Sequence, residues 1–284
     1  MTRFRRTLPP ALRVIVALTL ACLNGWAAAM DLVPLRVSEH VWYVRGDSGV
    51  ASAANQGFNS NAGFVVTADS VVVVDALGTP ALGEALLTAI RRISTLPVRR
   101  VVLTHFHADH VGGVAELLLH RRVPVFGPAS EAIAGITNPV RQGDVLALPD
   151  FDASFTVLDI PGHTAGHVGY YSAPVLFCGD TLFAAGCGRV FDGTMAQLFA
   201  SLEKLSALPD ETRVYCTHEY TLANLAFAAA VEPGNPAIVE RIATATASRE
   251  RGEATVPFFL GGERRTNPFL RCREPDVIAA ARSE

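Results

Sequence analysis

Short apolar runs alternate with longer segments of helical periodicity along most of the chain. Val71–Val74 is an unbroken run of β-branched residues, which is typical of a buried strand, and Asp75 follows it directly. In Pro80–Ile93 the leucines and alanines recur at helical spacing. The same criteria predict further strands at 63–67, 101–103, 123–126, 155–160, 168–172, 175–178 and 213–216, and helices at 115–119, 195–208, 222–231 and 237–251. We therefore expect two sheets with helices outside them and loops that converge at one edge.

The beginning of the chain departs from this pattern. Three arginines within the first six residues precede the apolar run Ala11–Ala21, and the small residues Ala27–Ala29 follow it. This order is typical of a secretory signal peptide over residues 1–29, and the apolar run is too short for an ordinary membrane-spanning helix. We therefore expect a periplasmic or secreted protein that begins near Met30 and is not stably inserted in a membrane. An uncleaved leader on a cytoplasmic protein is the alternative.

Composition narrows the class of protein. Half of the residues are hydrophobic and 18% are charged, as in a soluble globular protein. The formal net charge of −3 shows no excess of basic residues, so we do not expect a nucleic-acid partner. Four cysteines follow the leader at spacings that match no zinc-ribbon pattern, and they fit buried residues better than metal ligands. Export would place these cysteines in an oxidising compartment, where disulfides can form. The sequence does not decide whether Cys178, Cys187, Cys216 and Cys272 form disulfides.

The strongest chemical signal is a group of four ligand-type side chains within six residues. His105, His107, Asp109 and His110 directly follow the predicted strand at 101–103, and two glycines come after them. Imidazole suits zinc, iron and related ions, and a carboxylate adds a compensating negative charge. A lone histidine is more often a packing residue, but four such side chains together at a strand end indicate a metal site.

Three more ligand-type residues follow apolar strands further along the chain. His163 lies in the motif Pro-Gly-His-Thr-Ala-Gly-His, Asp180 in Cys-Gly-Asp-Thr and His218 in Cys-Thr-His-Glu. Loops at the ends of several strands can meet at one edge of a sandwich. The seven side chains together are therefore enough for two metal ions.

These motifs resemble those of the metallo-β-lactamase superfamily. The resemblance implies an α/β fold, a four-layered αββα sandwich with the metals at one edge. It also implies that the first metal is bound by His105, His107 and His163 and the second by Asp109, His110 and His218, with Asp180 bridging the two. His40 and His120 are then interpreted as surface or packing residues, and His167 as a residue that orients a ligand.

The ligand set predicts hydrolytic chemistry with two divalent ions, zinc in the first place and iron or manganese as alternatives. Two metals about 3.5–4 Å apart can hold a hydroxide, because coordination lowers the pKa of water to about 7. That metal-bound hydroxide is the expected nucleophile, and one metal polarises the carbonyl under attack. Asp109 and Asp180 are the expected catalytic residues.

From about Arg100 to Arg271 the chain is similar to the glyoxalase II family of hydroxyacylglutathione hydrolases. The resemblance lies in Phe177–Phe183, Gly186–Arg189, Thr217–Thr221 and Asn267–Arg271. It implies a thioesterase that cleaves S-(2-hydroxyacyl)glutathione, such as S-lactoylglutathione, to glutathione and D-lactate. It also implies a catalytic domain over residues 30–220 and a helical, substrate-binding segment over residues 221–284. The positions expected to bind the substrate, a small acyl thioester, are Arg189, Phe191 and Tyr220.

Other features depart from that family. Phe191 stands where a tyrosine is usual, Phe258–Phe259 replaces small hydroxyl residues, and the sequence ends at Glu284 without a basic segment. The motifs at 40–44, 54–58, 60–64 and 75–78 look instead like exported hydrolases of the same superfamily, including some linked to quinoprotein systems. An exported hydrolase of a different ester, lactone or other substrate is therefore the alternative. Asp180 disfavours a true β-lactamase, because those enzymes lack this bridging carboxylate. A metal-binding module without catalytic activity is the alternative from a different class of function.

Overall fold

The strands form two mixed sheets, the first of which contains the N-terminal half of the described chain. Its seven strands pair in chain order, the first four antiparallel and the rest parallel. They are β1 (Pro34–Arg36), β2 (Val41–Val44), β3 (Ala62–Val66), β4 (Val71–Val74), β5 (Val98–Val102), β6 (Val125–Pro128) and β7 (Asn138–Val140). The change to parallel pairing after β4 places the carboxyl ends of β4 and β5 at the same edge.

The second sheet has six strands in the order β15-β14-β11-β10-β9-β8. They are β8 (Val145–Leu148), β9 (Ala153–Asp159), β10 (Val168–Ser172), β11 (Val175–Gly179), β14 (Arg213–Cys216) and β15 (Phe258–Phe259). All neighbours are antiparallel except β11 and β14, which are parallel and therefore need a crossover connection. That connection contains the small hairpin of β12 (Leu182–Phe183) with β13 (Gly186–Cys187) and helix α5 (Met195–Ser206).

The main core lies between the two sheets. Val72 and Val102 of the first sheet belong to the same buried cluster as Val157 and Tyr170 of the second sheet. Each is at most 2% exposed, and burying a valine stabilises the fold by about 1.5–3 kcal/mol. The alternation of side chains along a strand explains why these residues face inward while their neighbours meet the helices.

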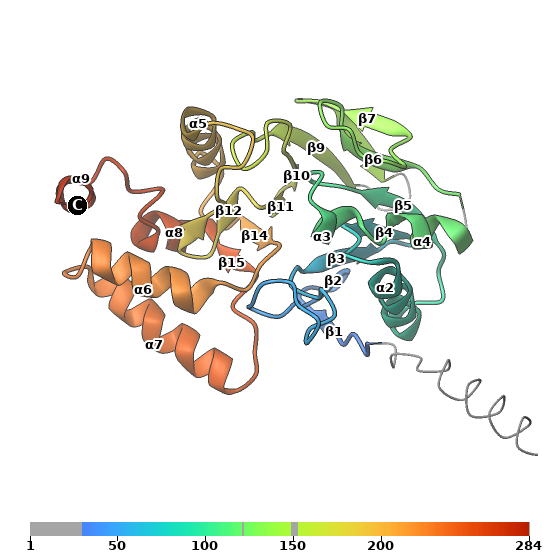
Figure 1. Cartoon of the computed structure of the whole chain (residues 1–284), viewed down its shortest axis with the longest axis horizontal. Coiled ribbons are helices and arrows are strands. Elements are labelled where there is room, and N and C mark those ends of the chain that lie inside the picture. The colour runs from blue at the N-terminus through green and yellow to red at the C-terminus, as the bar shows by residue number, and fades with distance from the viewer. Residues whose placement is uncertain (1–29, 121, 149–152, 284) are drawn as a thin grey trace, which may run out of the picture. The chain divides into compact units, whose positions relative to one another are not determined.

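Helices cover the outer face of each sheet (Figure 1). On the first sheet lie α2 (Pro80–Ile93) and α4 (Val114–His120), and α2 packs against α4 and β1; the short α3 (Ala108–Val111) precedes α4 at the edge of the sandwich. Thr79 caps α2 by accepting a hydrogen bond from the Leu82 amide. On the second sheet, α5 buries Leu198 and Leu205 in a cluster with the strand residue Leu176. The predicted four-layered αββα sandwich is confirmed.

The end of the described chain is helical, as predicted. It contains α6 (Thr221–Val231), α7 (Pro236–Glu250), α8 (Leu260–Thr266) and α9 (Pro275–Arg282). Leu225 of α6 and Ile238 of α7 pack with Ala185, the turn residue of the β12–β13 hairpin. None of the helices in the described chain is long and apolar enough to cross a lipid bilayer.

The computed structural model describes residues 30–120, 122–148 and 153–283. The predicted leader, residues 1–29, lies outside the described residues, and so does the side chain of His120. From Leu32 onward the chain forms one compact unit. The division into a catalytic domain that ends at residue 220 and a segment that follows it therefore stays a prediction.

Candidate metal centre

Four loops bring all seven predicted ligands together at one edge of the sandwich. The loop after β5 carries His105 and His107, and it leads into α3, which carries Asp109 and His110. The loops after β9, β11 and β14 carry His163, Asp180 and His218 respectively. The first sheet therefore supplies four ligands and the second sheet three. Their donor atoms form two groups, each with all atoms within 4.8 Å of one another.

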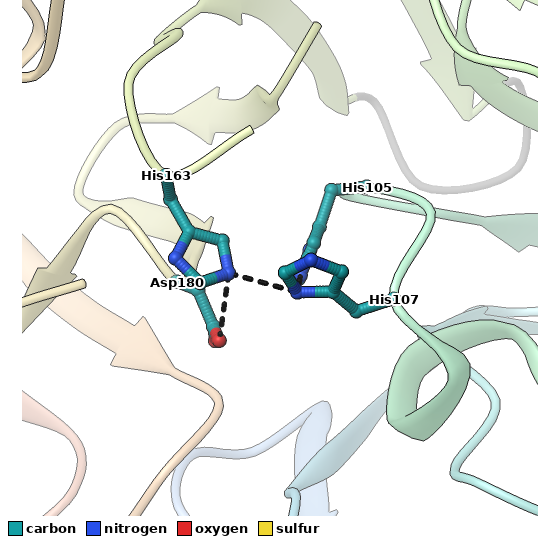
Figure 2. Close-up of side chains that lie close together, drawn as sticks. All are labelled: His105, His107, His163 and Asp180. Atoms are coloured by element: carbon teal, nitrogen blue, oxygen red, sulfur yellow. Dashed lines mark hydrogen bonds and ion pairs between the residues drawn. The ribbon is translucent and has the colours of Figure 1, made fainter. Parts of the chain in front are cut away.

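The first group contains His105, His107, His163 and Asp180. The Nδ1 atom of His107 lies 3.2 Å from Nε2 of His105 and 3.0 Å from Nε2 of His163. Asp180 Oδ2 is 3.3 Å from His163 Nε2. Figure 2 shows the His107 and His163 rings and the Asp180 carboxylate pointing toward one another. Three imidazole nitrogens and one carboxylate oxygen that converge in this way match the donor set of a metal such as zinc.

The second group contains Asp109, His110 and His218. His110 Nε2 is 3.7 Å from Asp109 Oδ1, and His218 Nε2 is 3.6 Å from Asp109 Oδ2. Asp180 Oδ2 also lies 3.2 Å from His218 Nε2, so this carboxylate stands between the two groups. Within the described chain, His110 Nε2 is buried without a hydrogen-bond partner. A buried ring nitrogen left unpaired is what a metal ion would satisfy, so the residues fit a second ion.

Hydrogen bonds on the far side of three rings fix which nitrogen faces the centre. His110 Nδ1 contacts Asp75 Oδ2 at 3.1 Å, His163 Nδ1 the carbonyl of Arg189 at 2.6 Å, and His218 Nδ1 the carbonyl of Asn59 at 2.8 Å. Because a carbonyl or carboxylate accepts the proton of Nδ1, Nε2 is left with its lone pair toward the centre. This arrangement prepares the rings as ligands.

Two of these orienting groups were not predicted from the sequence. Asp75 is 1% exposed, lies at a positive φ of 57° and also accepts the backbone N–H of Thr104 at 2.9 Å. Its one sequence signal is that it directly follows the Val71–Val74 strand. Asn59 contributes its carbonyl to His218 and its amide nitrogen, at 3.0 Å, to Asp109 Oδ2. The contact with His218 is made by the backbone carbonyl of Asn59, and a backbone contact leaves no pattern in the sequence.

The predicted role of His167 agrees with its contacts. Its Nε2 accepts the backbone N–H of Asp180 at 3.0 Å, so it holds the segment that carries the shared carboxylate. Burial lowers the pKa of His167 to about 3, which keeps the ring neutral and able to accept. His167 is in neither donor group.

The two groups differ in their electrostatics. Burial lowers the pKa values of His105, His107 and His163, which favours the neutral imidazole that a metal requires. Burial alone would also lower the pKa of His110, but the carboxylates of Asp180 and Asp75 outweigh it and raise the pKa to about 9.

Asp180 itself remains ionised. Its burial opposes the charge, yet His218 and His110 hold the pKa well below the ordinary value. The centre therefore presents an ionised carboxylate between the two groups of imidazoles.

The residues predicted to bind substrate lie on either side of the centre. The ring of Phe191, 59% exposed, is 4.8 Å from that of His107 at the first group. The exposed guanidinium of Arg189 lies 5.5 Å from the Phe191 ring. At the second group, the ring of Tyr220 stacks on that of His218 at 4.9 Å with an interplanar angle of 2°. Substrate could thus be contacted from both sides, although the roles of these three residues stay predictions.

Among the described side chains, His40 and the cysteines lie outside the donor groups. The side chain of His40 is 44% exposed. The four described cysteines have free thiols, and two of them are buried. The disulfides that the sequence left open are therefore absent among the described residues.

Comparison with known proteins identifies the relatives of this centre and of the helical segment. Residues 55–218 match the family model described as metallo-beta-lactamase superfamily, and residues 219–284 match that described as hydroxyacylglutathione hydrolase C-terminus. A hydroxyacylglutathione hydrolase from Nitrosomonas europaea is 47% identical over 202 residues, which cover 71% of this chain and 77% of that protein. The chain belongs to the hydroxyacylglutathione hydrolase family. Another hydroxyacylglutathione hydrolase, from Cupriavidus taiwanensis, is 53% identical over 199 residues, covering 66% of this chain and 75% of the relative.

Solved structures place this hydroxyacylglutathione hydrolase family member in the same fold class. ETHE1 from Myxococcus xanthus superposes with a TM-score of 0.58 at 23% identity, over 81% of this chain and 88% of that one. The BLEG-1 B3 metallo-beta-lactamase superposes with a TM-score of 0.57 at 23% identity, over 80% and 99% respectively. At this identity the likeness concerns the fold alone. Both resemblances inferred from the sequence, to the superfamily and to glyoxalase II, are confirmed.

Proposed function

We propose that this protein hydrolyses S-(2-hydroxyacyl)glutathione thioesters, such as S-lactoylglutathione, to glutathione and D-lactate. The observation that carries the proposal is the pair of donor groups that share Asp180, in a chain whose C-terminal part matches the hydroxyacylglutathione hydrolase model. Two relatives that are 51% and 50% identical to this chain over the matched residues are named hydroxyacylglutathione hydrolases. No serine or cysteine nucleophile is needed, because the donor groups suit two metal ions.

We propose divalent zinc for both ions, with iron or manganese as the alternatives. The first group offers three imidazoles and a carboxylate, and the second offers two imidazoles and one carboxylate in addition to Asp180. These donor types suit zinc and also iron. When bound, such ions would supply an activated water and polarise the thioester carbonyl.

The side chains divide the remaining work. Asp180 lies beside ring nitrogens of both groups, and its negative charge would offset that of the cations when they are bound. Asp109 is 24% exposed, so the centre is reached from solvent on its side. Phe191 and Tyr220 would border the acyl thioester at the first and second group. Because an ordinary thiol has a pKa of about 8.5, the glutathione sulfur can leave as the thiolate without a strong acid beside it.

A hydrolysis screen tests the proposal. Purified protein would be assayed with S-lactoylglutathione, lactones and β-lactams, and its metal content would be measured on the same sample. We expect about two metals per chain and thioester hydrolysis well above that of the other classes. Hydrolysis of a lactone or another ester in place of the thioester would support the alternative of an exported hydrolase with a different substrate. A fully metallated protein inactive on all classes would contradict enzymatic function.

We also propose that the protein is exported to the periplasm or secreted, with residues 1–29 as the signal peptide. The arginines, the apolar run and Ala27–Ala29 support this proposal. Fractionated cells should contain a form that begins near Met30 outside the cytoplasm, as mass spectrometry of its N-terminus would show. Full-length protein confined to the cytosol would contradict export, and would agree with a substrate made from a cytoplasmic thiol.

A further inference from the structure

A cavity of about 220 Å³, lined by both apolar and polar side chains, lies beside the second donor group. Three parts of the chain form it: the loop between β2 and β3, the start of α6 and the last turn of α7. Figure 1 shows α6 and α7 as the neighbouring helices of the C-terminal segment. The lining residues are Ser48, Glu219, Tyr220, Leu222, Ala223 and Arg249.

Tyr220 connects this cavity to the metal centre. Its ring is stacked on that of His218, a member of the second donor group, and it also lines the cavity. A ligand whose reacting atom lies between the two donor groups would therefore need only to extend past Tyr220 to enter the cavity. The resemblance implied that the segment over residues 221–284 binds substrate, but it assigned that role to no individual residue of the segment.

The charge within the cavity favours an anion. The guanidinium of Arg249 donates from Nη1 to the carbonyl of Glu253 at 2.8 Å, and it has no carboxylate partner in the described part of the chain. Glu219 carries the opposing charge, but it is 4% exposed and already accepts the Thr255 amide at 3.1 Å and the hydroxyls of Thr255 and Thr221. The Arg249 guanidinium is therefore the charged group that can pair with an anion, and the Ser48 hydroxyl can donate a hydrogen bond to it.

The proposed substrate has a chemical feature that fits this arrangement. The thioester sulfur of an acylglutathione belongs to the central cysteine of a tripeptide, and both ends of the tripeptide carry a carboxylate. With the sulfur at the metal centre, the two ends diverge. Arg189 adjoins the first group, since its carbonyl accepts from His163, and Arg249 lies beyond Tyr220 at the second group. A cation is thus present in each direction.

We infer that the cavity formed by Ser48, Tyr220 and Arg249 binds one of the two terminal carboxylates of the glutathione tripeptide, through the Arg249 guanidinium. The inference rests on the proposed function, because it concerns the thiol part of that substrate. It makes Arg249 a specificity-determining residue: it contacts the peptide and not the thioester carbonyl. Its contribution should be alike in the ground state and the transition state.

The test compares Arg249→Gln with Arg251→Gln, a matched control two residues away. Arg251 is exposed, pairs with Glu253 and does not line the cavity. Arg249→Gln should raise KM for S-lactoylglutathione about 10-fold or more and leave kcat nearly unchanged, because one charge-assisted hydrogen bond is lost. The lactoyl thioester of N-acetylcysteamine, which has no carboxylate, should be hydrolysed equally by all variants. Arg249→Lys should recover part of the loss.

Binding of S-methylglutathione, measured by calorimetry, gives a readout that does not depend on hydrolysis. We expect Arg249→Gln to weaken it by the same factor and Arg251→Gln to leave it unchanged. Esterifying the glycine carboxylate should weaken binding to the wild-type protein, and have no effect in Arg249→Gln, if the glycine end occupies the cavity. If the γ-glutamyl end occupies it, that ester should weaken binding equally in both proteins.

Different experimental results would contradict this inference and the proposed function. If the wild-type protein hydrolyses S-lactoylglutathione, and Arg249→Gln and Arg251→Gln have the same KM and the same affinity, the proposed function stands. The cavity then does not bind the carboxylate, and this inference is wrong. Equal loss on the N-acetylcysteamine thioester would also overturn it, because the effect would not depend on a carboxylate. A wild-type protein that neither hydrolyses nor binds the glutathione compounds would overturn both.

Discussion

At the scale of single residues, the arrangement of the centre depends most on Asp180. Its Oδ2 lies 3.3 Å from a ring nitrogen of the first group and 3.2 Å from one of the second. The other carboxylate of the centre, Asp109, contacts ring nitrogens of the second group alone. A negative charge that stands between two cations reduces their repulsion, which a neutral amide of the same shape cannot do.

Asp180→Asn should therefore lower both metal content and activity. We expect fewer than two metals per chain and a fall in kcat/KM of about 100-fold or more, because both metal functions depend on this carboxylate. Metal analysis and kinetics on one sample provide the measurement. His40→Ala, at a half-exposed side chain outside the donor groups, is the control and should change neither quantity. Similar losses in the two variants would contradict the assignment of Asp180.

The pKa values of the histidines predict that the two metals respond differently to pH. A metal must displace a proton from His110, whose pKa is raised to about 9, whereas burial already keeps His105 neutral at lower pH. The Asp180 carboxylate outweighs burial and raises the pKa of His218 too. Affinity at the second group should therefore fall as the pH decreases below about 9, by up to about tenfold per pH unit for each histidine that must lose a proton, while affinity at the first group changes little. Chelator competition between about pH 8 and about pH 6 measures both dissociation constants. Equal slopes for the two metals would contradict this difference.

At the scale of elements, the buried carboxylate of Glu263 joins the helical segment to the hairpin beside the centre. Glu263 is 0% exposed and accepts the Ala185 amide of the β12–β13 turn at 2.8 Å. It also pairs with Arg241 of α7 and accepts from Asn267 at 3.0 Å. The distant β12–β13 hairpin thus meets α7 and α8 at one carboxylate, which sets the position of α7 and hence of Arg249 on its last turn.

Arg241→Ala should destabilise the protein strongly, because it leaves a fully buried charge without its partner. The expected loss is about 3–5 kcal/mol, read from the midpoint of urea unfolding at a fixed metal concentration. Glu263→Gln should cost less, since no unpaired buried anion remains and the side chain of Arg241 is 18% exposed to water. Arg251→Ala removes an exposed arginine and should leave the midpoint unchanged. If Arg241→Ala also leaves it unchanged, the pair does not hold the segment in place.

Sequence periodicity located the long elements accurately and missed the short ones. Val71–Val74 and Pro80–Ile93 have the bounds that their patterns predicted, because each is long or uniform enough to show its period. By contrast, β7 has three residues and β15 two, too few for a period to be visible. The pairing of β11 with β14 is decided by packing between distant segments, and local pattern does not contain that information.

The same limit applies to the centre. Its ligands were found because each lies in a sequence motif that contains residue types known to bind metal ions. The carboxylate that orients His110 comes from Asp75, 35 residues away, and the group that orients His218 is the carbonyl of Asn59, 159 residues away. Every residue has a carbonyl, so a contact of this kind becomes visible only in the folded chain.

At the scale of the whole molecule, the metal centre joins the two sheets at one edge. The loop after β5 of the first sheet and the helix α3 that follows it supply four ligands, and the loops of the second sheet supply His163, Asp180 and His218. Between the sheets, a separate core of valines and aromatic residues does not involve the ligands. Two kinds of contact therefore connect the sheets: the converging candidate metal ligands at one edge and the apolar core between the sheets.

Removing the metals should therefore loosen the edge of the sandwich and leave its core folded. Chelation is expected to abolish activity, with recovery when zinc, iron or manganese is added back. Because metal binds the folded state, each site at a free metal concentration about 100-fold above its dissociation constant stabilises the protein by about 2.7 kcal/mol, and the melting temperature should fall accordingly. Hydrogen exchange should quicken in residues 104–113, 161–167 and 216–219, whereas β4 and β10, whose side chains form the core, should stay protected. Global loss of protection on chelation would show that the metals hold the whole fold together, and full activity without metal would contradict the assignment of the centre.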